Sequence, residues 1–179
     1  MNKLVPLLAL ALLTQAAGCR KKDPAPDPPT NPLSQLSPET QTGQRTFGCL
    51  VNGQAWTPAG NPLAGPLLSA VYLQGRLGVS ANRVVVVNGT NSFQRIGFSF
   101  EGIQTTGTYA LDDSQTKVGS YEDFDHSCNF YTSKSQVGVL IITKLDPVAR
   151  IVSGRFSFTL EAPGCGKVVV TDGRFDCPF

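Results

Sequence analysis

Residues 151–161 read IVSGRFSFTLE, and this stretch decides the class of fold. Apolar and polar side chains alternate along it: Phe156, Phe158 and Leu160 are apolar, and the residues beside them are polar or charged. A period of two residues is typical of a β-strand that has one face in the core and the other in water. The stretch therefore predicts a half-buried strand of an antiparallel sheet.

Further strands are expected on both sides of this stretch. Residues 94–101 alternate in the same way, with Ile96, Phe98 and Phe100 on the apolar face. Short runs rich in Val, Ile, Phe and Tyr, separated by turn residues, predict the other strands. These runs are 46–51, 54–57, 67–73, 83–87, 106–111, 128–132, 136–144 and 167–175. Asn52-Gly53, between the first two runs, is a strong signal for a two-residue hairpin turn.

The pattern as a whole predicts one all-β domain over residues 45–179. No stretch of this range has the period of an amphipathic helix. About nine to eleven short strands at this spacing favour an antiparallel β-sandwich or a flattened barrel. The range carries eleven basic and ten acidic side chains with no cluster of either sign, which argues against a nucleic-acid-binding surface.

Residues 1–18 predict a secretory signal that is removed. Lys3 supplies a positive start, an apolar run follows at 4–13, and small residues occupy 16–18. The run has about ten residues, whereas a membrane-spanning helix needs about 20. The sequence Ala16-Ala17-Gly18-Cys19 resembles the bacterial lipobox, in which the chain is cut before a cysteine that receives lipid. We therefore expect Cys19 to anchor the protein in a membrane; the alternative is an ordinary signal peptide with a chance cysteine.

Residues 19–44 are expected to form a disordered tether. Six prolines lie between positions 24 and 38, and Leu33 and Leu36 are nearly the only large apolar residues. Such a stretch cannot bury enough surface to offset the entropy lost on ordering. The basic residues at 20–22 either favour anionic head groups or form a solvated charge run. In some bacteria an Asp directly after the lipidated cysteine resembles a retention signal for the inner membrane, and here Arg20 takes that position. The expected location is therefore the outer membrane, with the domain facing either the periplasm or the exterior.

Four short motifs stand out in the domain: TFGCLVNG at 46–53, ITKLD at 142–146, IVSGRF at 151–156 and VTDGRFD at 170–176. As a set they resemble the sequences of a large group of uncharacterised lipoproteins from Bacteroidota. The resemblance implies an envelope address and a β-rich fold. It implies no active residues, because the motifs are similar to strand and turn sequences and the family's biochemical role is unassigned.

The cysteines divide into one for lipid and four for the domain. With Cys19 modified, Cys49, Cys128, Cys165 and Cys177 remain in an oxidising compartment, which favours two disulfides. Three pairings are possible. We favour Cys128–Cys165 together with Cys49–Cys177, which would join the first and last strands. The four cysteines contain no Cys-x-x-Cys pair, so a structural zinc site is not expected. The remaining alternative to two disulfides is a free thiol, above all at Cys177.

No catalytic residue is predicted. His126 is the chain's single histidine and lies in YEDFDHSC, where Asp123 or Asp125 could orient it. No Gly-x-Ser-x-Gly turn or other placed nucleophile accompanies it. The acidic residues at 112, 113, 122, 123 and 125 could serve glycoside hydrolysis or bind calcium, but they lack regular ligand spacing. We expect a solvated loop histidine, no metal site, no cofactor and no enzymatic activity.

Two functional hypotheses follow from these patterns. The first is a non-catalytic envelope lipoprotein whose β domain has a structural role or binds another protein. The second is a module that binds a glycan or another small ligand, with Trp56, Tyr72 and Tyr109 as the candidate aromatic platform. The alternative use of these rings, with Tyr121 and Tyr131, is to build the core. An exposed strand edge would favour the first hypothesis, and a surface aromatic platform the second.

Overall fold

The computed structural model describes residues 31–62, 65–112 and 115–179, and eleven β-strands account for most of them. One 3-10 turn, η1 (Pro32–Gln35), precedes the strands, and no α-helix occurs in these ranges. Accordingly, no helix there has the length and apolar character needed to cross a membrane. The strands are β1 (Thr46–Val51), β2 (Gln54–Trp56), β3 (Leu68–Leu73), β4 (Arg76–Val87), β5 (Thr90–Glu101), β6 (Gly107–Leu111), β7 (Lys117–Asp123), β8 (Cys128–Tyr131), β9 (Gly138–Asp146), β10 (Ile151–Ala162) and β11 (Gly166–Pro178).

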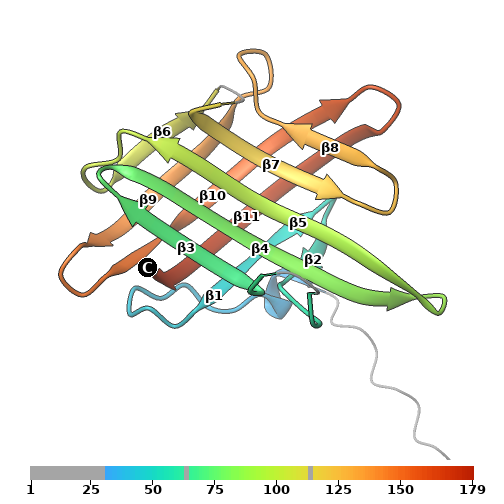
Figure 1. Ribbon diagram of the computed structural model, residues 1–179, viewed down its shortest axis with the longest axis horizontal. Coiled ribbons are helices and arrows are strands. Elements are labelled where there is room, and N and C mark those ends of the chain that lie inside the picture. The colour runs from blue at the N-terminus through green and yellow to red at the C-terminus, as the bar shows by residue number, and fades with distance from the viewer. Residues whose placement is uncertain (1–30, 63–64, 113–114) are drawn as a thin grey trace, which may run out of the picture.

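The strands form two sheets that pack face to face. Sheet A has the order β2-β1-β11-β10-β9-β6, and sheet B has the order β3-β4-β5-β7-β8. Every pairing between these strands is antiparallel. In Figure 1 the strands of sheet B lie in front and cross those of sheet A behind them. The prediction of an antiparallel β-sandwich is confirmed.

Two-residue turns shape the hairpins of both sheets. Three of these turns have positive φ at both residues: Asn52-Gly53, Gln74-Gly75 and Asn88-Gly89. This conformation matches the right-handed twist of the flanking strands, and Asn and Gly adopt it at low cost. The predicted Asn52-Gly53 turn is confirmed. The turn at Asn88-Gly89 joins β4 and β5, which pair along their whole length without a bulge. They are the two longest strands of sheet B.

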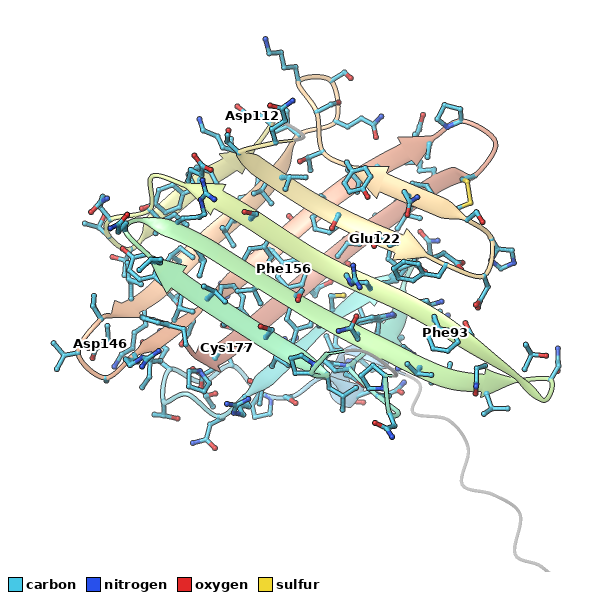
Figure 2. The ribbon with its side chains drawn as sticks, in the orientation of Figure 1. Phe93, Asp112, Glu122, Asp146, Phe156 and Cys177 are labelled. Carbon is cyan, nitrogen blue, oxygen red and sulfur yellow. A yellow bond between two sulfur atoms is a disulfide. The ribbon has the colours of Figure 1, made fainter. Side chains whose placement is uncertain are left out.

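The alternating apolar residues meet between the sheets. Phe156, near the centre of Figure 2, lies with its ring centroid 5.0 Å from that of Phe47 and 5.5 Å from that of Phe98. Phe98 belongs to sheet B and the other two rings belong to sheet A, so this cluster joins the layers. Full burial of a side chain of this size contributes about 1.5–3 kcal/mol. Apolar contact between the sheets is therefore the main source of stability.

The ordered part of the domain begins before residue 45. Residues 31–44, expected to belong to the disordered tether, lie against the outer face of sheet A. Leu36 is only 7% exposed and packs over Gly48, where a Cβ atom would come within 3.3 Å of it. The proline content of the stretch predicts disorder, but it does not reveal that sheet A offers Leu36 an apolar site. Residues 1–30, with the signal sequence and Cys19, lie outside the described residues.

Three strands of sheet B differ from the prediction, one of them being β5, which begins at Thr90 and not at residue 94. The sequence predicts a strand at 83–87 only, whereas β4 begins at Arg76, and it predicts none where β7 lies. In β7 the buried positions are Gly119 and Tyr121, and they alternate with Ser120 and Glu122. Small and charged residues hide the period of two in this strand. Its core face is defined by the neighbouring β5 and not by a local apolar run.

The loop before β3 limits how much of sheet B has a free edge. Ala59 N donates to Asn82 O, and Val84 N donates to Ala59 O, so this loop covers the far end of β4. Gly60 has φ +80°, and a Cβ atom there would lie 2.0 Å from Val84 O. Only glycine fits so close an approach with that backbone conformation. The loop therefore covers β4 at residues 82–84, whereas β3, which pairs with residues 76–81 of β4, has no strand on its other side.

Candidate functional site

A disulfide ties the two sheets together at one end of the sandwich. Cys128 at the start of β8 and Cys165 in the turn between β10 and β11 are bonded, with their Cα atoms 5.8 Å apart. β8 belongs to sheet B and the turn belongs to sheet A. The bond is the yellow link in Figure 2. The predicted Cys128–Cys165 pair is confirmed.

The second predicted pair, Cys49–Cys177, is wrong. Both cysteines are buried free thiols. β1 and β11 are neighbours, as expected, but Thr46 pairs with Asp176, which places Cys177 beyond Thr46 and away from Cys49. The offset is about four residues, or roughly 13 Å along the strand, far more than a disulfide spans. Burial raises the pKa of Cys177 to about 12 and that of Cys49 further, so both thiols stay protonated at neutral pH.

His126 lies on the exposed turn between β7 and β8. Its Nδ1 atom is 2.9 Å from a carboxylate oxygen of Asp123, and its side chain is 75% exposed. The hydrogen bond that Asp123 accepts and the negative charge of its carboxylate raise the pKa of His126. Within the described ranges, the ring contacts this orienting carboxylate but is not bonded to a hydroxyl or a thiol.

The acidic side chains singled out in the sequence do not converge. Glu122 lies 3.2 Å from Arg95 on the outer face of sheet B, and Asp125 accepts from the backbone N–H of Phe93. Figure 2 shows Asp112 well apart from Glu122. In the part of the chain that the structure describes, no group of three or more His, Cys, Asp or Glu residues is arranged to hold a metal ion. The remaining acidic residue, at position 113, lies outside that part.

The predicted aromatic platform of Trp56, Tyr72 and Tyr109 is also wrong. Trp56 is 4% exposed and belongs to the core. Tyr72 lies in sheet B and Tyr109 in sheet A, and their hydroxyl groups donate to the backbone carbonyls of Ile103 and Thr105. Both tyrosine rings pack against the core cluster. The rings build the sandwich, which was the alternative that the sequence left open.

The edge of sheet B formed by β3 is the first candidate binding surface. This strand pairs with β4 alone, and its sequence LSAVYL has no charged residue. Val71 and Leu73 project from its outer face and are 59% and 67% exposed. They border a hollow of about 540 Å³, which is completed by Gln74, Arg76, Gly78, Ser99, Glu101 and Gly102.

A second hollow, of about 360 Å³, lies on the outer face of sheet A. We call it the arginine hollow, because Arg155 and Arg174 stand directly opposite each other in the β10–β11 pair. Glu39 reaches over from the N-terminal segment, and one of its carboxylate oxygens accepts a hydrogen bond from Arg155 Nε at 2.8 Å and lies 2.7 Å from Arg155 Nη2 in an ion pair. Val139 and Ile141 of β9 supply an apolar side. Glu39 raises the pKa of Arg155, chiefly through the hydrogen bond, so this guanidinium stays charged.

A buried carboxylate fastens the N-terminal segment to the same face of sheet A. Asp176 is fully buried and accepts from Thr40 Oγ1 at 2.6 Å, from Ser153 Oγ at 2.7 Å and from the backbone N–H groups of residues 42–44 at 2.8–3.0 Å. Burial alone would raise the pKa of Asp176, but the donors, with Thr40 the strongest, outweigh it and lower the pKa to about 2. The group is therefore ionised and holds residues 40–44 in place.

The sequence contains only part of the information that defines these surfaces. Val71 and Leu73 alternate within a predicted strand, but their place at a sheet edge depends on the order of the strands. Arg155 and Arg174 fall on predicted strands. Whether they face each other across the β10–β11 pair depends on the register of the two strands, which shifts near Phe156. No local pattern indicates that Glu39 reaches them.

Comparison with known proteins identifies a family but no annotated relative. A family model described as "Domain of unknown function (DUF6252)" matches residues 74–176, from the turn after β3 into β11. The matched range contains the ITKLD and IVSGRF motifs and ends at Asp176, whereas TFGCLVNG lies before it. No curated protein and no solved structure matches the chain. Because the matched range covers more than half of the chain, the protein belongs to the DUF6252 family, a domain family of unknown function.

Proposed function

We propose that this chain is a lipid-anchored protein of the bacterial cell envelope whose β-sandwich binds another protein and catalyses no reaction. The anchor and the outer-membrane address rest on the sequence alone, through the signal at residues 1–18 and the lipobox that ends at Cys19. The binding role rests on the structure of the β3 edge.

The observation that carries the binding role is that β3 has none of the usual protections of an edge strand. It is the longest of the four strands that end the two sheets, which are β2, β6, β3 and β8. Proteins commonly shield such edges with lysine, proline or bulges, because unpaired backbone groups attract other strands. β3 contains no charged residue and no proline, and its register with β4 is regular from Leu68 to Leu73.

The hydrogen-bonding groups of β3 alternate between its neighbour and its free edge. Asn82 N donates to Leu67 O, immediately before the strand begins. In an antiparallel ladder every second residue bonds to the partner strand. Residues 69, 71 and 73 therefore pair with β4, and the backbone N–H and C=O groups of Leu68, Ala70 and Tyr72 point to the edge. No turn or loop backbone within the described ranges bonds to them.

An added strand would complete this edge and cover apolar surface at the same time. The backbone groups at residues 68, 70 and 72 would pair with an extended segment of the partner, as in other cases of strand addition. Alternate side chains of that segment would lie beside Val71 and Leu73. The partner we propose is therefore an extended segment of an envelope protein with apolar residues at every second position.

Cross-linking from β3 tests the proposal in living cells. We place the photoreactive residue p-benzoylphenylalanine at Val71 in the full-length, lipid-anchored chain, and Val86 of β4 serves as the control because it is similarly exposed, at 68%. Irradiation is expected to give a discrete adduct with one envelope protein from position 71 and none from position 86. Adding Leu73→Lys should reduce the adduct by more than about tenfold, because burying an unpaired ammonium group in the new interface is costly.

Equal adducts from the two positions would contradict the binding role of β3. An adduct from position 71 that survives Leu73→Lys would contradict it as well. Because Leu73 is largely exposed, the lysine should leave the unfolding midpoint of the chain nearly unchanged, and this is the check on folding.

A further inference from the structure

We infer that the arginine hollow on sheet A is a binding site for a small organic carboxylate, and that the side chain of Glu39 occupies the ligand's place in the unliganded protein. This inference is independent of the strand-binding role proposed for β3, because the hollow lies on the other sheet. It rests on the pairing of two guanidinium groups, on their incomplete hydrogen bonding, on the charge balance of the hollow and on its apolar side.

The pairing of Arg155 with Arg174 requires an acceptor in the hollow. Like charges directly opposite each other on neighbouring strands repel, and their Cβ atoms are only about 4.5–5.5 Å apart. Both side chains project from the outer face of sheet A, since the residues beside them, Phe156 and Phe175, are buried in the core. A planar guanidinium fits a carboxylate well, because it presents several N–H donors in a fixed fork.

Protein groups satisfy these donors only in part. A guanidinium carries five N–H bonds. Among the described residues, Arg174 donates through Nη1 to Ser37 O at 3.3 Å, and its buried Nε atom has no acceptor. Both contacts between Arg155 and Glu39 go to the same carboxylate oxygen, Oε2. The hollow thus holds more donor groups than Glu39 and Ser37 satisfy.

Glu39 has the properties of an internal, displaceable ligand. It comes from the N-terminal segment and not from sheet A, and its side chain is 44% exposed, as that of Arg155 is 56% exposed. The segment does not depend on this contact, because Asp176 holds residues 40–44 separately. The Glu39 side chain can therefore leave the guanidinium while its backbone stays attached.

The charges of the hollow select a ligand with a single negative charge. Asp172 also lines it. With Glu39 in place, the two arginines are balanced by two carboxylates, and displacement of Glu39 leaves one uncompensated positive charge. A ligand with one carboxylate neutralises this positive charge, whereas a phosphate dianion would leave the hollow with one excess negative charge. Val139, which is 38% exposed, and Ile141 then favour a ligand that carries an apolar group beside its carboxylate.

Titration of the full chain with benzoate tests this inference. The protein is kept in dodecyl maltoside, and binding is followed by calorimetry and by the Nε–Hε signals of its arginines in NMR spectra. Benzoate is expected to bind and to shift the signals of Arg155 and Arg174, whereas benzamide, its uncharged isostere, does not. If Glu39 occupies the site about nine-tenths of the time, Glu39→Gln raises the affinity about tenfold. Arg155→Ala should abolish binding.

Two controls separate this site from other effects. Arg76→Ala removes a similarly exposed arginine that forms an ion pair with Glu101 on sheet B, and it should leave benzoate affinity unchanged. Leu73→Lys should also leave it unchanged, which keeps the outcome separate from that of the β3 proposal. The inference is overturned if benzoate and benzamide bind equally, if neither binds, or if Glu39→Gln weakens the fold without raising benzoate affinity. The last result would make Glu39 a structural clamp only.

Discussion

Asp176→Asn is expected to lower the free energy of unfolding by about 3–5 kcal/mol, because it breaks a buried, charged hydrogen-bond network. Both carboxylate oxygens of Asp176 accept from N–H and O–H donors. An asparagine retains one acceptor but turns an NH₂ group toward donors where the second oxygen was. Urea unfolding of the full chain measures the loss, and faster tryptic cleavage after Arg45 would report release of the N-terminal segment.

The same carboxylate gives the stability a characteristic pH dependence. The pKa of Asp176 is about 2 in the folded protein, below the value near 3.9 expected in the unfolded chain. A lowered folded-state pKa adds stability that is fully present above the unfolded value and is lost as the pH falls through the folded value. We expect the wild type to lose about 2 kcal/mol between pH 5 and pH 2 from this group. The Asp176→Asn variant should lack this component.

Asp172→Asn is the matched control for this prediction. Asp172 is an exposed carboxylate of the same strand, and replacing it should change the unfolding free energy by less than about 0.5 kcal/mol. If the two variants lose equal stability, or if Asp176→Asn retains the acid-sensitive component, then Asp176 is not the group that fastens residues 40–44.

Removal of the Cys128–Cys165 disulfide is the second large effect that we expect. The bond closes a loop between residues separated by 37 positions and joins the two sheets. In the chain-entropy account, opening a loop of this size destabilises the protein by about 4 kcal/mol. Urea unfolding of the Cys128→Ala/Cys165→Ala double variant measures this loss against the oxidised wild type.

Reduction provides an independent check on the disulfide. Dithiothreitol should shift the wild type toward the stability of the double variant and leave the double variant unchanged. The other two cysteines, Cys49 and Cys177, are buried and remain as thiols in both proteins. A double variant that loses less than about 1 kcal/mol would show that apolar packing between the sheets makes the cross-link redundant.

The fold was largely accessible from the sequence, because most strands carry their own signals. The alternation in residues 151–161 and 94–101 lies within β10 and β5. The sheet order was not accessible, since it depends on contacts between segments far apart in the chain. The register of the strands is not accessible either. The sequence correctly predicts that the strands of Cys49 and Cys177 are neighbours, but it does not predict the offset that keeps the two thiols apart.

The candidate sites were less accessible than the fold. Aromatic residues suggested a platform, but Trp56 and the tyrosines are needed to fill the space between two sheets, as large rings usually are. The edge residues Val71 and Leu73 look like any other strand residues until the strand order is known. Glu39 lies in a proline-rich stretch whose composition predicts disorder, and its role follows only from the anchorage of that stretch at Asp176.

The two candidate surfaces lie on different sheets, so one protein can use both at once. β3 belongs to sheet B and the arginine hollow belongs to sheet A. Residues 37–44, which reach the hollow and Asp176, directly follow the stretch that leads from the proposed lipid anchor. A ligand that displaces the Glu39 side chain would therefore bind beside the segment through which we propose that the domain is attached.

The binding role of β3 is decided by amide hydrogen exchange along this one strand. In the free, full-length chain, the amides of Leu68, Ala70 and Tyr72 should exchange rapidly, and those of residues 69, 71 and 73 should be protected by β4. In the complex with the cross-linked partner, the first set should become protected as well, while the amides at the Asn88-Gly89 turn stay unchanged. Protection that appears on β6 or β8 and leaves residues 68, 70 and 72 unaffected would show that the partner binds elsewhere and would contradict the proposal.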